Sequence, residues 1–332
     1  MTSPFFIAYL VTYICLHSLT FPFSRKQGKI PNMKFFFFTF LSFYSLYANA
    51  QKSDTTIRYF NAAFATVPKT SSIYSGMAYP ENNKWATVVK NDSGNILMTG
   101  TYKDKSLKIR DGLFTFFYPN GKQQMRGTYV NNAQYDLWMS WYPGGERKDS
   151  LYFKNSFKQG AAASWFENGN PKYHGNYLVS YADSSWTWYH ENGKPSTKEK
   201  YESGKLTFLE CFDTLGNYTG VTCALEKGPT IKGYYGGINK YIIDSLYYPE
   251  EALRKNIQGI VDMSFTISKE GKLGQIKILS TPDSLLSNEV IRVLKSVPVW
   301  YPAIEHNRAV EQTLTLKIPF YKAVNVPIGQ RP

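Results

Sequence analysis

The sequence is poor in the residues that carry most enzyme chemistry. Among its 332 residues there are only three Cys and four His. None of them stands in a metal-ligand spacing such as Cys-x-x-Cys or in a recognisable nucleophile motif. The sequence also lacks a Gly-rich phosphate-binding loop and a nucleophile elbow. We therefore expect no catalytic residue, no metal site, no cofactor and no enzyme activity.

The remaining candidates for a site have plainer interpretations. Three His, at positions 174, 190 and 306, lie outside the N-terminal leader described below. We interpret His174, His190 and His306 as solvated surface, because lone polar side chains without a motif are mostly exposed. Trp300 lies between Pro298 and Pro302, and we interpret it as a side chain that fills a core rather than as a ligand platform.

Basic clusters are missing as well, although the net charge is +13. The excess is spread along the chain, and without the first 50 residues it falls to +9, from 34 basic and 25 acidic residues. A nucleic-acid-binding footprint is a concentrated basic patch, so we expect no nucleic-acid partner. The charge serves solubility, with weak attraction to anionic lipid or polysaccharide surfaces as a secondary effect.

Long apolar runs occur only near the N-terminus. Met33-Lys34 precedes FFFFTFLSFYSLY, and small residues follow at Ala48 and Ala50. This order of a basic start, an apolar run and small residues is typical of a secretory signal peptide. We predict that residues 1–50 are a leader with its start at Met33, and that the mature chain begins at Gln51.

An alternative interpretation is a membrane anchor within residues 5–23. Its flanking positive charges, Arg25, Lys26 and Lys29, all lie on the C-terminal side. The positive-inside rule would then leave the downstream domains in the cytoplasm. The signal peptide is favoured on these flanks, and it predicts a periplasmic protein rather than one anchored in the inner membrane.

Two Cys remain in the predicted mature chain, Cys211 and Cys223. They lie symmetrically about Asn217 in CFDTLGNYTGVTC, as they would in a hairpin centred there. An exported protein meets oxidants, so we predict a disulfide between them. The alternative is that both are small buried hydrophobic residues.

Aromatic residues are the excess, at 17% of the chain, and they recur with a period. The turn glycines Gly121, Gly145 and Gly169 are 24 residues apart. Aromatic residues stand four residues before Gly121, Gly145, Gly169, Gly193 and Gly216; they are Phe117, Trp141, Trp165, Tyr189 and Phe212. Others stand eight residues after Gly94, Gly121, Gly145, Gly169 and Gly193; they are Tyr102, Tyr129, Phe153, Tyr177 and Tyr201. We predict that both columns lie in the core of a stacked repeat structure.

Each repeat reads as two strands around an Asn-Gly or Gly-Gly turn. A single hairpin is marginal in water, so the repeats must bury their aromatic faces against each other. We predict a long antiparallel meander over residues 84–226, preceded by an N-terminal segment, 51–83. The recurring aromatic, Asn-Gly and Gly-x-Tyr elements from Lys84 to Ala224 resemble bacterial MORN-like repeats, which implies a scaffold or an interaction surface.

The pattern changes after Gly228-Pro229. Helical character over 239–246 and 249–255 is followed by a hairpin with strands at 261–267 and 275–279, a helix over 284–295 and a strand over 311–320. The economical fold is a small α+β domain with a three-stranded antiparallel sheet and helices on one face.

This module resembles the C-terminal domain of TonB, which in that family drives outer-membrane transporters from the periplasm. The shared elements are Tyr248-Pro-x-x-Ala252, Gly259, the Gly271 turn, Trp300-x-Pro302 and the strand ending in Pro319-Phe320. We assign this domain to residues 231–322 and a tail to 323–332. An energy transducer also needs an N-terminal membrane helix and a Pro-rich spacer, but the repeats occupy the place of the spacer.

The resemblance implies that the last strand takes up an extended peptide by β-strand addition. Its predicted partner-binding residues are Glu311, Gln312, Thr313, Leu314, Thr315, Leu316, Lys317 and Ile318. Alternation puts Gln312, Leu314, Leu316 and Ile318 on one face and the other four on the opposite face.

Three functions are compatible with the sequence. The first is a periplasmic protein that binds a peptide of an envelope partner such as a TonB-dependent outer-membrane transporter, with the repeats as spacer or scaffold. The second is a membrane-anchored energy transducer of TonB type. The third is a structural envelope protein whose repeats bind glycan or lipid.

Overall fold

The computed structural model describes residues 54–321. The predicted leader, the alternative anchor, the mature N-terminus at Gln51 and the tail 323–332 lie outside these residues. The described residues from Thr55 onward form one compact unit. None of the helices in this described part is long and apolar enough to cross a membrane.

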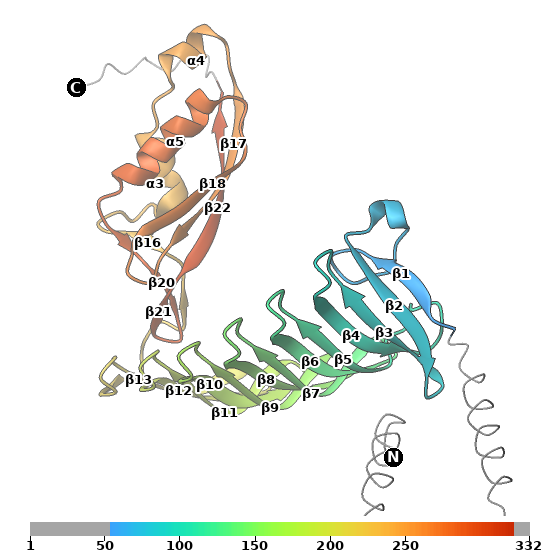
Figure 1. Ribbon diagram of the computed structural model, residues 1–332. Coiled ribbons are helices and arrows are strands. Elements are labelled where there is room, and N and C mark those ends of the chain that lie inside the picture. Colours follow the sequence, from blue (N-terminus) through green and yellow to red (C-terminus); the bar gives the residue numbers. More distant parts are fainter. Residues whose placement is uncertain (1–53, 322–332) are drawn as a thin grey trace, which may run out of the picture. The chain divides into compact units, whose positions relative to one another are not determined.

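The aromatic repeats form one antiparallel sheet of 14 strands, in which every strand pairs with its neighbours in sequence (Figure 1). The strands are β1 (Thr56–Phe60), β2 (Tyr74–Glu81), β3 (Lys84–Lys90), β4 (Ile96–Tyr102), β5 (Gly112–Phe117), β6 (Gln123–Val130), β7 (Ala133–Trp141), β8 (Arg147–Lys154), β9 (Phe157–Trp165), β10 (Pro171–Leu178), β11 (Tyr181–Tyr189), β12 (Pro195–Glu202), β13 (Lys205–Phe212) and β14 (Tyr218–Gly220). The predicted meander is confirmed. It begins earlier than the repeat register, because β1 and β2 lie within the segment 51–83.

Two kinds of turn alternate along the meander. At the predicted Asn-Gly sites the turn is longer, as between β5 and β6, where the Gly121 N–H donates to the Tyr118 carbonyl and Gly121 has a φ of 82°. From β6 onward the intervening turns have two residues with positive φ, such as Asn131 at 51° and Asn132 at 69°. Two-residue turns of this kind match the right-handed twist of the strands they join.

The core of the array is a row of large side chains laid over small ones. Phe114 is the register partner of Gly127, and a Cβ on Gly127 would lie 2.0 Å from the ring of Trp138. The same arrangement returns at Gly175, where a Cβ would lie 2.1 Å from the ring of Trp186. Glycine is needed at both positions because the indole occupies the space of a side chain. This explains the Gly of the Gly-x-Tyr element.

The two predicted aromatic columns do not share one core. In the later column Tyr102 is buried, and Tyr129, Phe153 and Tyr177 pack edge-on against core rings. The earlier column has no fully buried member, and most of the later column is also only partly buried; the earlier column is Phe117, Trp141, Trp165, Tyr189 and Phe212. Consecutive residues of a strand point to opposite faces, so Tyr189 faces away from its neighbour Trp188, which stacks on core residue Trp186.

The C-terminal module has the predicted order of elements. Its helices are α3 (Gly237–Ser245), α4 (Glu250–Arg254) and α5 (Ser284–Ser296), and its main strands are β17 (Gly259–Ile267), β18 (Leu273–Ser280) and β22 (Gln312–Phe320). The strands form a sheet in the order β18-β17-β22. Figure 1 shows the helices on one face of this sheet. The predicted fold class is therefore confirmed.

The core of this module joins alternate strand residues to one stripe of α5. Phe265 and Ile318 from the sheet and Val290 and Leu294 from α5 are buried in one cluster. Trp300 belongs to this cluster and lies 5.8 Å from Phe265 between ring centroids. Burial of such side chains contributes roughly 1.5–3 kcal/mol each relative to exposure, so the cluster accounts for much of the stability of the module.

Short strands around Trp300 were not predicted. They are β15 (Glu226–Lys227), β16 (Thr230–Ile231), β19 (Trp300–Tyr301), β20 (Ala303–Glu305) and β21 (Arg308–Val310). β20 and β21 form a hairpin whose tip is His306-Asn307, and β20 also pairs with β15. The prolines flanking Trp300 indicate an extended chain, but they do not show which segment pairs with it.

Candidate functional site

The last strand, β22, is an edge of the three-stranded sheet. It pairs with β17 from Gln312 to Phe320 through nine register partners without a break. Within residues 54–321 no strand pairs with its other side. In an antiparallel strand every second residue directs its N–H and C=O away from a given neighbour, so β22 presents a row of unpaired backbone groups.

The side chains of β22 alternate as the sequence predicts. Leu316 and Ile318 are buried and Leu314 is partly buried against the same core. Thr313, Thr315 and Lys317 are exposed. The two N-terminal members of the set, Glu311 and Gln312, are exposed as well. The apolar face holds the strand on the helices while the polar face and the backbone edge stay accessible.

The opposite edge, β18, offers a comparison with β22. Its pairing with β17 is interrupted by two register shifts. Ser264 in β17 has Lys277 of β18 as its partner on one side and Thr315 of β22 on the other. Bulges twist a strand and break its row of hydrogen-bonding groups, so β22 is the better template of the two for a further strand.

An ion pair lies on the exposed face of this sheet. Lys317 Nζ lies 3.6 Å from Asp262 Oδ2, and the lysine side chain is 71% exposed. Such a surface pair contributes at most about 1 kcal/mol. Lys317 can therefore turn to another carboxylate at little cost.

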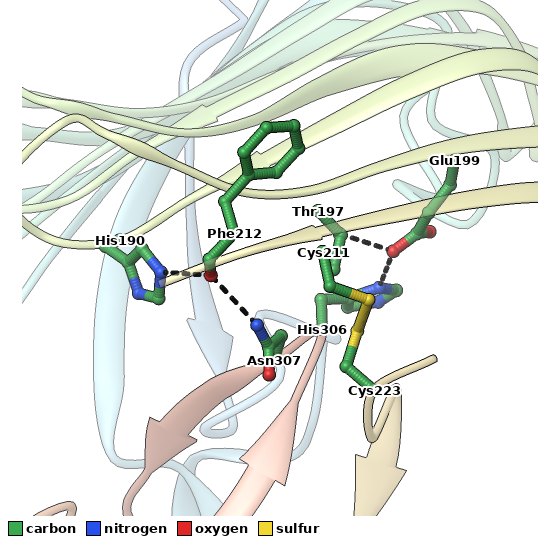
Figure 2. Close-up of a disulfide and its surroundings, with 8 residues drawn as sticks. All are labelled: His190, Thr197, Glu199, Cys211, Phe212, Cys223, His306 and Asn307. Atoms are coloured by element: carbon green, nitrogen blue, oxygen red, sulfur yellow. Dashed lines mark hydrogen bonds and ion pairs between the residues drawn. A yellow bond between two sulfur atoms is a disulfide. The ribbon is translucent and has the colours of Figure 1, made fainter. Parts of the chain in front are cut away.

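Cys211 and Cys223 are joined by a disulfide, with 6.2 Å between their Cα atoms (Figure 2). The pairing is not the symmetric one that the sequence suggests, because the strand partner of Cys211 is Gly220. Cys223 follows β14 and returns to Cys211 from outside the hairpin. The bond holds the segment leaving the array against β13.

The interpretation of the His residues as solvated surface is wrong for two of the three. His190 is only 9% exposed. The Nδ1 atom of His306 lies 2.7 Å from a carboxylate oxygen of Glu199, a residue that is 1% exposed. The error has a physical cause: the two partners lie far apart in sequence, so no local motif could show the pair. His174 is exposed.

Glu199 is the residue that sequence reasoning missed. It also accepts hydrogen bonds from the Thr197 hydroxyl at 2.6 Å and the Tyr201 hydroxyl at 2.8 Å. Burial raises the pKa of Glu199, but the hydrogen bonds from His306, Thr197 and Tyr201 outweigh it and hold the pKa below its ordinary value. A signal was present, because the repeat register places Gly127, Leu151 and Gly175 in the same column as this acid.

Between positions 54 and 321 no group of three or more His, Cys, Asp or Glu side chains is placed to hold a metal ion.

Comparison with known families adds to this geometry. Residues 244–321 match the model described as Gram-negative bacterial TonB protein C-terminal. The match contains β17, β18, α5 and β22, and it relates the C-terminal module to proteins of the bacterial envelope. We name this module the TonB-C-like domain. Residues 110–131 and 183–202 match the MORN repeat variant. Both resemblances are confirmed. A search of curated proteins finds no match for the chain.

Proposed function

We propose that this protein is a non-enzymatic binding protein of the periplasm, whose TonB-C-like domain takes up an extended peptide as a fourth strand beside β22. The partner is an envelope protein with an accessible unstructured segment, of which an outer-membrane transporter is the foremost example. The uninterrupted, unpaired edge of β22 is the observation that carries this proposal.

The chemistry of the edge fits such a ligand. An added strand satisfies backbone N–H and C=O groups irrespective of its sequence, and alternate side chains supply selectivity. The exposed Thr313 and Thr315 offer hydroxyl groups, and Lys317 offers a positive charge. We therefore expect a peptide with polar and acidic residues on this face. No cofactor is needed for such binding.

A cross-linking experiment tests the register. Cysteine is introduced singly at Thr313, Thr315 or Lys317 in the mature chain and labelled with a benzophenone maleimide, while the native cysteines stay joined. Each labelled protein is irradiated in an envelope extract, and cross-linked peptides are sequenced by mass spectrometry. Strand addition predicts that one peptide segment is captured, with the attachment point moving by two residues from one variant to the next.

Lys277→Cys is the matched control, because Lys277 and Thr315 are both register partners of Ser264 and lie on opposite edges. It should capture no such segment. Equal capture from β18, or attachment points that do not advance with the label position, would contradict strand addition at β22.

A further inference from the structure

In two of the repeats a tyrosine hydroxyl donates a hydrogen bond to a carbonyl of the next repeat, and a third repeat lacks this tyrosine. The Tyr118 hydroxyl donates to the carbonyl of Trp141 at 2.8 Å, and the Tyr142 hydroxyl donates to the carbonyl of Trp165 at 2.9 Å. One period later the same column holds Phe166, which has no hydroxyl. The equivalent acceptor is the Tyr189 carbonyl.

That acceptor is satisfied from the TonB-C-like domain. Arg308, in β21, donates from Nη1 to the Tyr189 carbonyl at 3.3 Å, and its guanidinium lies 5.7 Å from the centre of the Phe166 ring. Arg308 is only 5% exposed. The loss of one tyrosine hydroxyl thus coincides with a donor supplied by another part of the chain.

A second departure lies beside the first. The column that contains Ser140 and Ser164 holds Trp188 in the next repeat. The imidazole of His306 stacks on this indole with 3.6 Å between ring centroids, and the Arg308 guanidinium lies 5.1 Å from its centre. A large aromatic surface therefore appears in the repeat where the β20–β21 hairpin covers it.

The third departure is Glu199, which stands in a column of glycine and leucine and binds His306 (Figure 2). Removing the partner of a buried carboxylate is strongly destabilising, because it leaves an uncompensated buried charge. Glu199 therefore makes the last repeats dependent on the hairpin in a way that Leu151, in the same column, is not.

The tip of the β20–β21 hairpin is a tight turn that forms hydrogen bonds with the end of the array. His306 and Asn307 have positive φ values of 47° and 59°, so they form the tip of a two-residue turn. Asn307 Nδ2 donates to the Phe212 carbonyl at 2.9 Å, beside His190 Nε2 at 3.3 Å from the same oxygen. The backbone N–H groups of the tip donate to the carbonyls of Leu225 and Ala224. These two residues directly follow Cys223, which the disulfide fixes to β13.

We propose that the last repeats, from Phe166 to Phe212, are a docking site for the tip of the β20–β21 hairpin, so that the array and the TonB-C-like domain behave as one body. Each of the three departures from the repeat pattern contacts the hairpin: Trp188 and Glu199 contact His306, and Phe166 contacts Arg308. If β22 also binds a peptide, which rests on the function proposed above, the array then holds that peptide at a fixed position.

The test measures a distance between the two parts in the mature chain. Spin labels are attached at Lys154→Cys in the array and Lys277→Cys in the domain, both exposed positions. Double electron–electron resonance should give one narrow distance distribution. Glu199→Leu puts at this position the leucine that stands at Leu151 in the same column. His306→Asn removes the imidazole, and asparagine tolerates the positive φ of this turn position. Each variant should broaden the distribution at least twofold.

Ser164→Ala is the control, since Ser164 lies in the Trp188 column one repeat earlier, and it should leave the distribution narrow. Circular dichroism checks that each variant is folded. His306→Asn alters only the turn of the hairpin, so it still tests the docking site if Glu199→Leu disturbs the array. A broad distribution in the unmodified protein would overturn the docking site. A distance distribution that stays narrow in the double variant His306→Asn with Arg308→Gln would also overturn the docking site. Neither outcome depends on peptide capture.

Discussion

The imidazole of His306 lies flat on the indole of Trp188, with 10° between the ring planes. Trp188→Ser restores the residue found at Ser140 and Ser164 and removes this stack. We expect the ring protons of His306 to lose the upfield shift caused by the indole, which NMR of the imidazole measures. Tyr189→Ser alters the opposite face of the same strand and should leave these signals unchanged. Unaltered His306 signals in Trp188→Ser would contradict the stacking.

Acid should weaken the contacts of Glu199. Its pKa is held below the ordinary value in the folded protein, although burial alone raises it. A carboxyl group of this kind stabilises the fold above its unfolded pKa of about 4.3, and the contribution is lost as the pH falls through the folded value. Urea unfolding from about pH 5.5 downward should therefore show the wild type losing its advantage over Glu199→Gln. A difference that stays constant with pH would exclude this linkage.

Gly127→Ala should destabilise the array, because the new Cβ would lie 2.0 Å from the ring of Trp138. Overpacking of this kind typically costs about 1–3 kcal/mol in the free energy of unfolding. Combining it with Trp138→Leu makes room for the methyl group, so the two effects should not add. Denaturant titration of the single and double variants checks this, and simple additivity would show that the two residues are not in contact.

Trp138→Ala should cost more stability than Trp165→Ala. Trp138 is 3% exposed in the core row, and large-to-Ala changes of such residues cost about 3–5 kcal/mol. Trp165 lies in the partly buried column, where Arg147 covers its ring at 5.0 Å. Thermal unfolding of both variants measures the difference. Equal melting temperatures would mean that Trp165 contributes as much to stability as the more deeply buried Trp138.

The disulfide should protect the end of the array. Closing a loop of this size stabilises a protein by about 2–4 kcal/mol. Cys211→Ser with Cys223→Ser should therefore lower the unfolding free energy by that order in a denaturant titration. Alkylation of the native protein without reduction should label neither cysteine, and labelling of both would exclude the bond.

The fold class could be predicted because its signals are local. Turn glycines at a fixed period and alternating apolar residues specify hairpins, and neighbouring hairpins in a chain pair with each other at little cost in loop entropy. The same holds for β22, whose inward Leu316 and Ile318 follow from alternation alone. The burial of the earlier aromatic column could not be predicted from spacing, because adjacent aromatic residues such as Trp188 and Tyr189 lie on opposite faces of the strand and the repeat period does not show which face is the core.

The sequence by itself determined that this chain forms a repeat array followed by a TonB-C-like domain, and which residues of the last strand face water. Only the tertiary structure decided that Glu199 is paired and that Arg308 supplies a missing donor. The reason is that these contacts join residues far apart in sequence. Their energies arise from burial, and burial exists only after both parts of the chain have folded and met.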